Sequence, residues 1–161
     1  MGKKSSHSHD FSQSIDAVYA GFTDPEIVRA KLEALGSRDI EIEIATEDGV
    51  TTVTIDRTVP VNVSGSMKAM VGDSQKVRQT ERWEGEAGGP YSATVDIEPV
   101  GVPASMHGET TLSADGDGCA CVATMEARCT IPLMGGKVEK MMIGDSDTKI
   151  AQEFAYIAQH C

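Results

Sequence analysis

Aromatic residues and basic residues are both scarce in this chain of 161 residues. Phe, Trp and Tyr together make up only 4% of it, so a core must be built mainly from Val, Ile, Met and Ala. Lys and Arg number 14 against 25 Asp and Glu, which gives a formal net charge of -11. That balance argues against non-specific nucleic-acid binding and against adsorption to anionic membranes, because both need a basic surface.

Long hydrophobic runs and metal-ligand spacings are also missing. No apolar run approaches the roughly 18 residues of a membrane-spanning helix, and the first residues lack the apolar middle region of a secretory signal. Cys119 and Cys121 have no second pair at zinc-site spacing among the remaining cysteines, Cys129 and Cys161. We therefore expect a cytoplasmic protein with reduced cysteines, no metal or other cofactor, no nucleic-acid partner and no stable membrane insertion.

The C-terminal residues predict one long helix, from Lys137 to Gln159, that follows a Pro/Gly breaker. At 1.5 Å per residue this helix is roughly 34 Å long, enough to cross a small domain. Asp147 interrupts its apolar stripe, and two interpretations stay open: a kink with solvated carboxylates, or a carboxylate that faces a cavity. The stripe follows the i, i+3, i+4, i+7 spacing of a helix with one buried face and consists of Ile143, Ile150, Ala151, Phe154, Ile157 and Ala158.

Upstream of this helix, the pattern predicts a strand, two short helices and six more strands. The first strand covers residues 4–11, with His7 and His9 expected in solvent. The helices cover residues 14–22 and 25–35, each preceded by capping residues. A short helical turn is predicted at residues 66–72. The remaining segments alternate apolar and polar residues and are joined by hairpin-length connections, which predicts antiparallel strands. The first of these strands runs from residue 38 to a turn at 47–49, and the others cover residues 50–59, 76–86, 91–98, 105–112 and 119–131.

Two charged residues interrupt apolar strand faces much as Asp147 interrupts the helix. Arg57 shares its face with valine and isoleucine, and Glu81 shares its face with Trp83, the only tryptophan. A twisted sheet that grips a helix leaves a hollow between them unless large side chains fill it, and this chain has few aromatic residues. We therefore expect a ligand cavity lined by Trp83, Val95, Met106, Met125, Ile150 and Phe154, with Arg57, Glu81 and Asp147 as polar groups.

The order of these elements and three motifs resemble the START-like (SRPBCC) superfamily and, within it, the bacterial domain of unknown function 2505 family. The resemblance covers nearly the whole chain, from about residue 11 to residue 157. It implies a single domain over residues 1–161 with an α+β helix-grip fold, in which a curved antiparallel β-sheet wraps around a long C-terminal helix and two short helices follow the first strand. The motifs are Phe22-Thr23-Asp24, Thr80-Glu81-Arg82-Trp83 and Ile131-Pro132-Leu133-Met134-Gly135-Gly136-Lys137-Val138-Glu139.

The resemblance also implies a deep apolar cavity, which in the wider superfamily holds lipids, sterols, polyketides or hormones. We therefore expect the chain to bind or transport a small hydrophobic ligand, as a monomer or weak homodimer. One alternative is a cyclase- or aromatase-like enzyme acting on such a ligand, with Glu81 or Asp147 as the general acid/base. The other is an interaction module whose core is filled.

Overall fold

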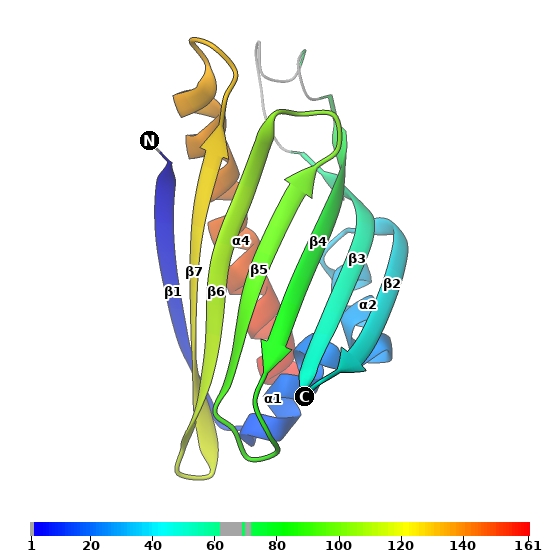
Figure 1. Ribbon diagram of the computed structural model, residues 1–161, viewed down its shortest axis with the longest axis vertical. Helices are drawn as coiled ribbons and strands as arrows, with labels where there is room; N and C mark the ends of the chain where they lie inside the picture. Colours follow the sequence, from blue (N-terminus) through cyan, green and yellow to red (C-terminus); the bar gives the residue numbers. More distant parts are fainter. Residues whose placement is uncertain (1, 62–68, 70–71) are drawn as a thin grey trace.

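A curved antiparallel sheet of seven strands wraps around one long C-terminal helix, α4 (Gly135–His160), in the computed structural model (Figure 1). The structure describes residues 2–61, 69 and 72–161. Two short helices, α1 (Ile15–Thr23) and α2 (Pro25–Ala34), follow the first strand. This arrangement confirms the predicted helix-grip α+β fold.

The strands appear where the alternating pattern predicts them, with ends that differ by a few residues. Their order across the sheet is β1-β7-β6-β5-β4-β3-β2, so consecutive strands are neighbours except at β1, which pairs with β7. The prediction of a helical turn at 66–72 falls outside the described residues, apart from 69 and 72. The strands are β1 (Lys3–Phe11), β2 (Arg38–Glu47), β3 (Val50–Pro60), β4 (Ser74–Glu84), β5 (Tyr91–Pro99), β6 (Ala104–Asp115) and β7 (Gly118–Cys129).

Capping and turn residues explain where several of these elements begin. The side chains of Ser14 and Asp24 accept hydrogen bonds from backbone N–H groups in the first turns of α1 and α2, respectively. Pro25 occupies the first position of α2, where a backbone N–H would have no partner. Between β2 and β3, Asp48 and Gly49 have φ angles of 52° and 80°, the left-handed pair that a two-residue hairpin turn requires.

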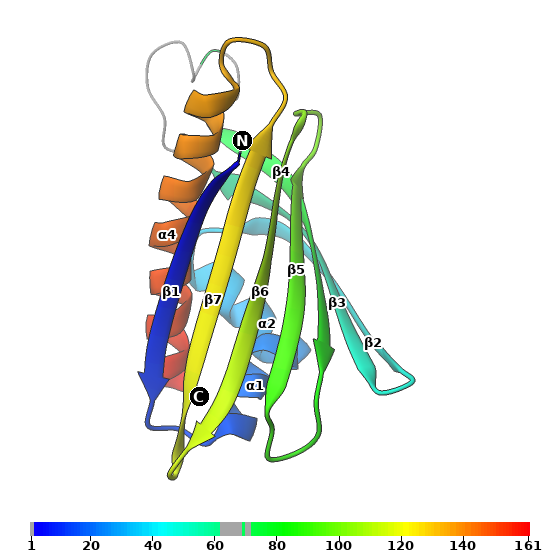
Figure 2. The same cartoon turned by 60° about the vertical axis from the view of Figure 1, so that its left-hand side comes forward.

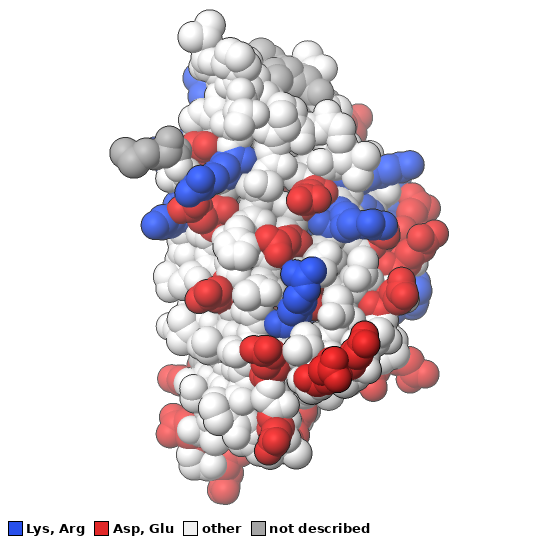
Figure 3. All heavy atoms as spheres, in the orientation of Figure 1, with Lys and Arg blue, Asp and Glu red and all other residues white. Residues whose placement is uncertain are grey.

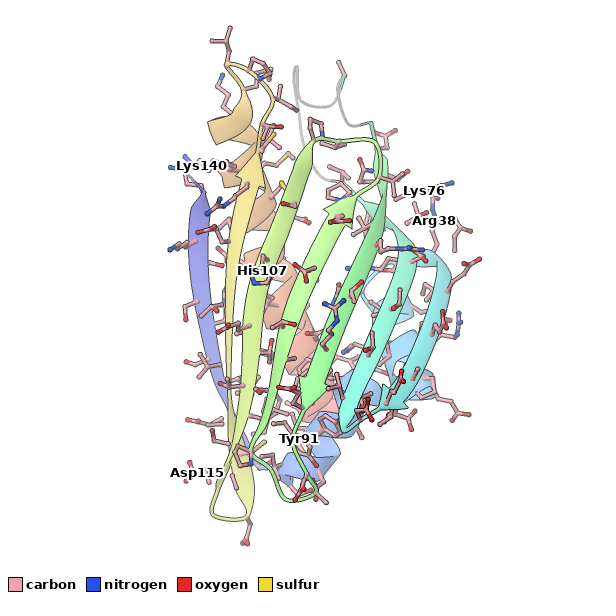
Figure 4. All side chains as sticks on the ribbon, in the orientation of Figure 1. Arg38, Lys76, Tyr91, His107, Asp115 and Lys140 are labelled. Atoms are coloured by element: carbon pink, nitrogen blue, oxygen red, sulfur yellow. The ribbon has the colours of Figure 1, made fainter. Side chains whose placement is uncertain are left out.

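The convex face of the sheet is charged and solvated. Lys and Arg are interspersed there with Asp and Glu, and acidic side chains gather at the lower end in Figure 3. His107 lies in the middle of this face (Figure 4), with its Nδ1 2.7 Å from Oδ1 of Asp96. Because successive residues of a strand point to opposite sides, the apolar residues of the strands face the helix.

Helix α4 lies on the concave side of the sheet, along β1 and β7 (Figure 2). Near its end, Gln13 Nε2 donates to the carbonyl oxygens of Ile157 at 3.2 Å and Ala158 at 2.6 Å. Near its start, Oε2 of Glu139 accepts the backbone N–H of Cys129 at 2.9 Å. These contacts attach both ends of the helix to the rest of the molecule.

The apolar stripe predicted for α4 is only partly buried. Phe154 and Ile157 are buried against the sheet, and Ile150 is half-buried. Ala151 and Ala158 are exposed, so the prediction that they face the core was wrong. Each follows an inward-facing residue, and consecutive residues of a helix point about 100° apart.

The core is densest at the lower end of the molecule in Figure 1, where α1 and the last turns of α4 meet the sheet. Tyr19 stacks on Tyr91 with ring centroids 3.8 Å apart, and Trp83 lies against Phe22 at 5.1 Å. Figure 4 shows Tyr91 at this end. Of the one Trp, three Tyr and three Phe in the chain, all but Tyr156 gather here. We call this cluster the packed end: Phe11, Tyr19, Phe22, Trp83, Tyr91 and Phe154.

Candidate functional site

A cavity of about 680 Å³ lies between the sheet and α4. Its walls come from α2, from β3 to β7 and from α4, together with Phe22 of α1 and loop residues. Its volume falls within the range of small-molecule sites, which is roughly 300–1,000 Å³. An interaction module with a filled core therefore does not fit the structure. We call its most apolar part the hollow end: Val95, Ile97, Met106, Met125, Met142 and Ile150.

The structure brings together all of the predicted site residues except Trp83 and Asp147. Trp83 is 1% exposed and packs between Tyr19 and Phe22, so it does not line the cavity as predicted. The remaining predicted residues do line it, and they are Arg57, Glu81, Val95, Met106, Met125, Ile150 and Phe154.

Asp147 also lies outside the cavity lining. Its Oδ1 is 2.7 Å from Nε2 of His7 on β1, and the two side chains are 43% and 25% exposed. Helix α4 is assigned without a break from residue 135 to residue 160. The structure thus shows neither a kink at Asp147 nor a carboxylate that faces the cavity: Asp147 is partly exposed, as the first interpretation expected, and it pairs with His7 of the edge strand. The prediction that His7 is solvated was wrong, because its side chain is 25% exposed and contacts this carboxylate.

Lys31 and Glu153 form an ion pair in the cavity wall, and sequence reasoning did not find them. Lys31 is 3% exposed, and its Nζ lies 3.0 Å from Oε2 of Glu153. The same Nζ donates to the carbonyl oxygen of Gly21 at 2.9 Å and lies 4.7 Å from the ring centre of Phe22. A signal was present, because Lys31 lies three residues after the buried Val28 and therefore on the inner face of α2.

Glu81 is a buried carboxyl whose two oxygens both accept hydrogen bonds. Oε1 accepts from the indole N–H of Trp83 at 2.8 Å, and Oε2 accepts from the side-chain amide of Gln79. Burial raises the pKa of Glu81, and the negative charge of Glu153 raises it further, while Lys31 opposes the shift. Trp83 is therefore a positioning residue for Glu81 and not part of the cavity wall.

Arg57 reaches into the cavity from β3. Burial lowers the pKa of its guanidinium, whereas the carboxyls of Glu153 and Glu81 oppose the shift. A guanidinium nevertheless keeps its charge in proteins. Its Nη1 is buried and has no hydrogen-bond partner among the residues that the structure describes.

Within the described part of the chain, no group of three or more His, Cys, Asp or Glu side chains is placed to hold a metal ion. No described helix is both long and apolar enough to cross a membrane. The charged groups in the cavity lining are Arg57, Glu81, the Lys31–Glu153 pair and the Lys149–Asp145 pair, and Gln79 adds a side-chain amide.

Solved structures with the same fold were found by structural comparison. A protein from Thermus thermophilus has a TM-score of 0.64 and 17% identity, covering 98% of this chain and 95% of its own. A point mutant of norcoclaurine synthase from Thalictrum flavum has a TM-score of 0.60 and 14% identity, covering 99% and 93%. Ara h 8.0201 has a TM-score of 0.61 and 10% identity, covering 99% and 100%. At these identities the likeness shows the fold alone.

Sequence comparison gives the family. Among curated proteins, none matches the sequence significantly. A family model described as "Protein of unknown function (DUF2505)" matches residues 6–161. The chain therefore belongs to the DUF2505 family, and it shares its helix-grip fold with these solved structures.

Proposed function

We propose that residues 1–161 act as a single START-like domain that binds or transports a small hydrophobic ligand, such as a lipid, sterol or polyketide-like molecule. The observation that carries the proposal is the cavity of about 680 Å³ under α4, whose lining is mostly apolar, with Val, Ile and Met prominent. Small-molecule sites combine such an apolar lining with a few polar groups that orient the ligand. Arg57, Glu81 and Gln79 are polar groups of that kind here.

Packing energetics support the same proposal. Side chains that border an empty space lose the dispersion contacts that a filled core provides. A ligand restores those contacts and removes its own apolar surface from water, at about 25 cal/mol per Å². Among the fold neighbours, the norcoclaurine synthase point mutant was solved in complex with a transition state analogue. That protein thus holds a small molecule, which makes the same use of this fold reasonable.

Native mass spectrometry of the purified protein tests the proposal. We expect a population with an additional mass from a co-purified apolar molecule, released when the protein is denatured. A protein that carries no added mass, and that also binds nothing from a panel of lipids and steroids, would contradict the proposal. We further propose that the protein is cytoplasmic and that it is a monomer or a weak homodimer. Light scattering after size-exclusion chromatography tests the oligomeric state.

A second candidate function is an enzyme acting on such a ligand, and Glu81 favours it. A buried carboxyl with a raised pKa in a ligand cavity has the properties of a general acid. The test is whether Glu81→Gln abolishes conversion of the co-purified molecule. If Glu81→Gln still converts the molecule, Glu81 is not the general acid of the reaction.

A further inference from the structure

The cavity has two chemically different walls. Strands β5, β6 and β7 and helix α4 supply the hollow end, in which Met106, Met125 and Met142 are prominent. Strands β3 and β4, helix α2 and the later part of α4 supply Arg57, Gln79, Glu81, Lys31 and Glu153, and the middle of α4 adds the Lys149–Asp145 pair. A ligand that fills this cavity therefore meets an apolar wall on one side and polar groups on the other.

Arg57 differs from the other charged groups of the polar wall in having no partner for its buried nitrogen. Lys31 and Glu153 neutralise each other at 3.0 Å. Glu81 accepts hydrogen bonds on both oxygens from neighbouring side chains. The buried Nη1 of Arg57 has no acceptor among the described residues. A buried donor without an acceptor is unfavourable, and more so when it carries charge.

The charges around Arg57 do not supply the missing acceptor. Lys31 pairs with Glu153, and Lys149 pairs with Asp145. The carboxyls of Glu153 and Glu81 favour the charged guanidinium, but neither accepts a hydrogen bond from its buried Nη1. Burial raises the pKa of Glu81, which favours the neutral form of that carboxyl. The polar wall therefore offers a ligand one charged donor, Arg57, that has a buried nitrogen without an acceptor.

We propose that the ligand is an amphipathic anion of the carboxylate type, whose head group accepts hydrogen bonds from Arg57 while its apolar body lies against the hollow end. This inference rests on the proposed function, because it names the ligand class for the same cavity. A guanidinium matches a carboxylate in both charge and geometry, since it can donate two parallel N–H bonds. A neutral alcohol also accepts hydrogen bonds, but it brings no negative charge to balance the guanidinium.

Three probes with one alkyl chain test the head group: dodecanoate, dodecan-1-ol and dodecylamine. Each is used at neutral pH to displace the neutral fluorescent probe N-phenyl-1-naphthylamine from the full chain. We expect dodecanoate to bind about 10- to 100-fold more tightly than dodecan-1-ol, the range for a charge-assisted hydrogen bond. We expect dodecylamine to bind most weakly, because the guanidinium of Arg57 repels an ammonium head group.

Substitutions then test whether Arg57 causes the preference for dodecanoate over dodecan-1-ol. Arg57→Gln should reduce the affinity for dodecanoate about 10-fold or more and leave that for dodecan-1-ol within about 3-fold. Lys149→Gln is the matched control, because it also removes a cation from the cavity lining. Lys149 already pairs with Asp145 at 2.9 Å, so this variant should keep the preference. If Arg57→Gln does not fold, Arg57→Met replaces it. The preference of the wild-type protein for dodecanoate over dodecan-1-ol can be measured without any variant.

The outcomes separate this inference from the proposed function. Three outcomes overturn the anion proposal: equal affinity for dodecanoate and dodecan-1-ol, tighter binding of dodecylamine than of dodecanoate, or displacement of the neutral probe by none of the three. In each case, binding of the neutral probe itself still supports a hydrophobic cavity. A preference for dodecanoate that persists in Arg57→Gln overturns the role of Arg57. If the neutral probe does not bind either, the proposed function fails together with the inference.

Discussion

The packed end and the hollow end share one strand, β5, and the long helix α4. Along β5, Tyr91 and Ala93 belong to the core around the packed end, whereas Val95 and Ile97 belong to the hollow end. The antiparallel pairing continues from one end to the other. Aromatic side chains bury about 150–250 Å² each, and they fill the space under α1 and α4 at one end only. The cavity therefore arises from where a few large side chains lie, and not from a change in the fold.

The largest expected effect is a difference in the free energy of unfolding that is lost when a side chain is replaced by alanine at the packed end or at the hollow end. Ile157 is 0% exposed among packed side chains, so Ile157→Ala should lower the free energy of unfolding by about 4 kcal/mol. Met125 already borders empty space, so Met125→Ala should cost only about 1–2 kcal/mol. Urea denaturation measures both values. Equal losses at the two positions would mean that the hollow end is packed as tightly as the other.

Enlarging a side chain gives the opposite test. Val53 and Val95 flank Glu81 on neighbouring strands, but only Val95 lines the cavity. Val53→Phe should destabilise the fold by about 2–3 kcal/mol through overpacking. Val95→Phe should change stability by less than about 1 kcal/mol, because its ring can enter the cavity. A Val95→Phe protein as unstable as Val53→Phe in thermal unfolding would argue against free space beside β5.

A pH-dependent effect is expected at Glu81, where the two ends meet. Its raised pKa means that the native state keeps a proton that the unfolded chain loses above its ordinary pKa of about 4.5. Wild-type stability should therefore fall relative to Glu81→Gln as pH rises from that value towards the folded-state pKa, by at most about 1.4 kcal/mol per pH unit. Urea titrations between about pH 4 and pH 8 measure this. Glu84→Gln, on the exposed face of β4, is the matched control. A constant difference between wild type and Glu81→Gln would contradict the assignment.

The smallest effect is expected outside the cavity, at the His7–Asp147 contact between β1 and α4. Both side chains are partly exposed, so a double-mutant cycle with alanine should give a coupling of about 0.5–1 kcal/mol. Ligand affinity should not change in either variant, because neither residue lines the cavity. A large loss of ligand affinity in Asp147→Ala would contradict this prediction and would show that Asp147 contributes to ligand binding.

The sequence predicted the elements of this fold well, because alternation and helical spacing are local properties. It also predicted Arg57 and Glu81 in the cavity wall, since each interrupts an apolar strand face. The partners of the charged residues could not be predicted in this way. His7 and Asp147 are 140 positions apart, and only the pairing of β1 with β7 brings them together. Trp83 shares an inward-facing strand side with Glu81, but no local pattern shows that α1 covers its ring.

The central claim is that the hollow end receives a hydrophobic ligand. Titration of N-phenyl-1-naphthylamine into wild type and Val95→Phe, with circular dichroism to verify folding, tests it most directly. We predict saturable binding at one site in the wild type and an affinity at least about 10-fold lower in Val95→Phe, because the new ring occupies the cavity. Equal affinity in the two proteins, or no binding to the wild type, would contradict the account.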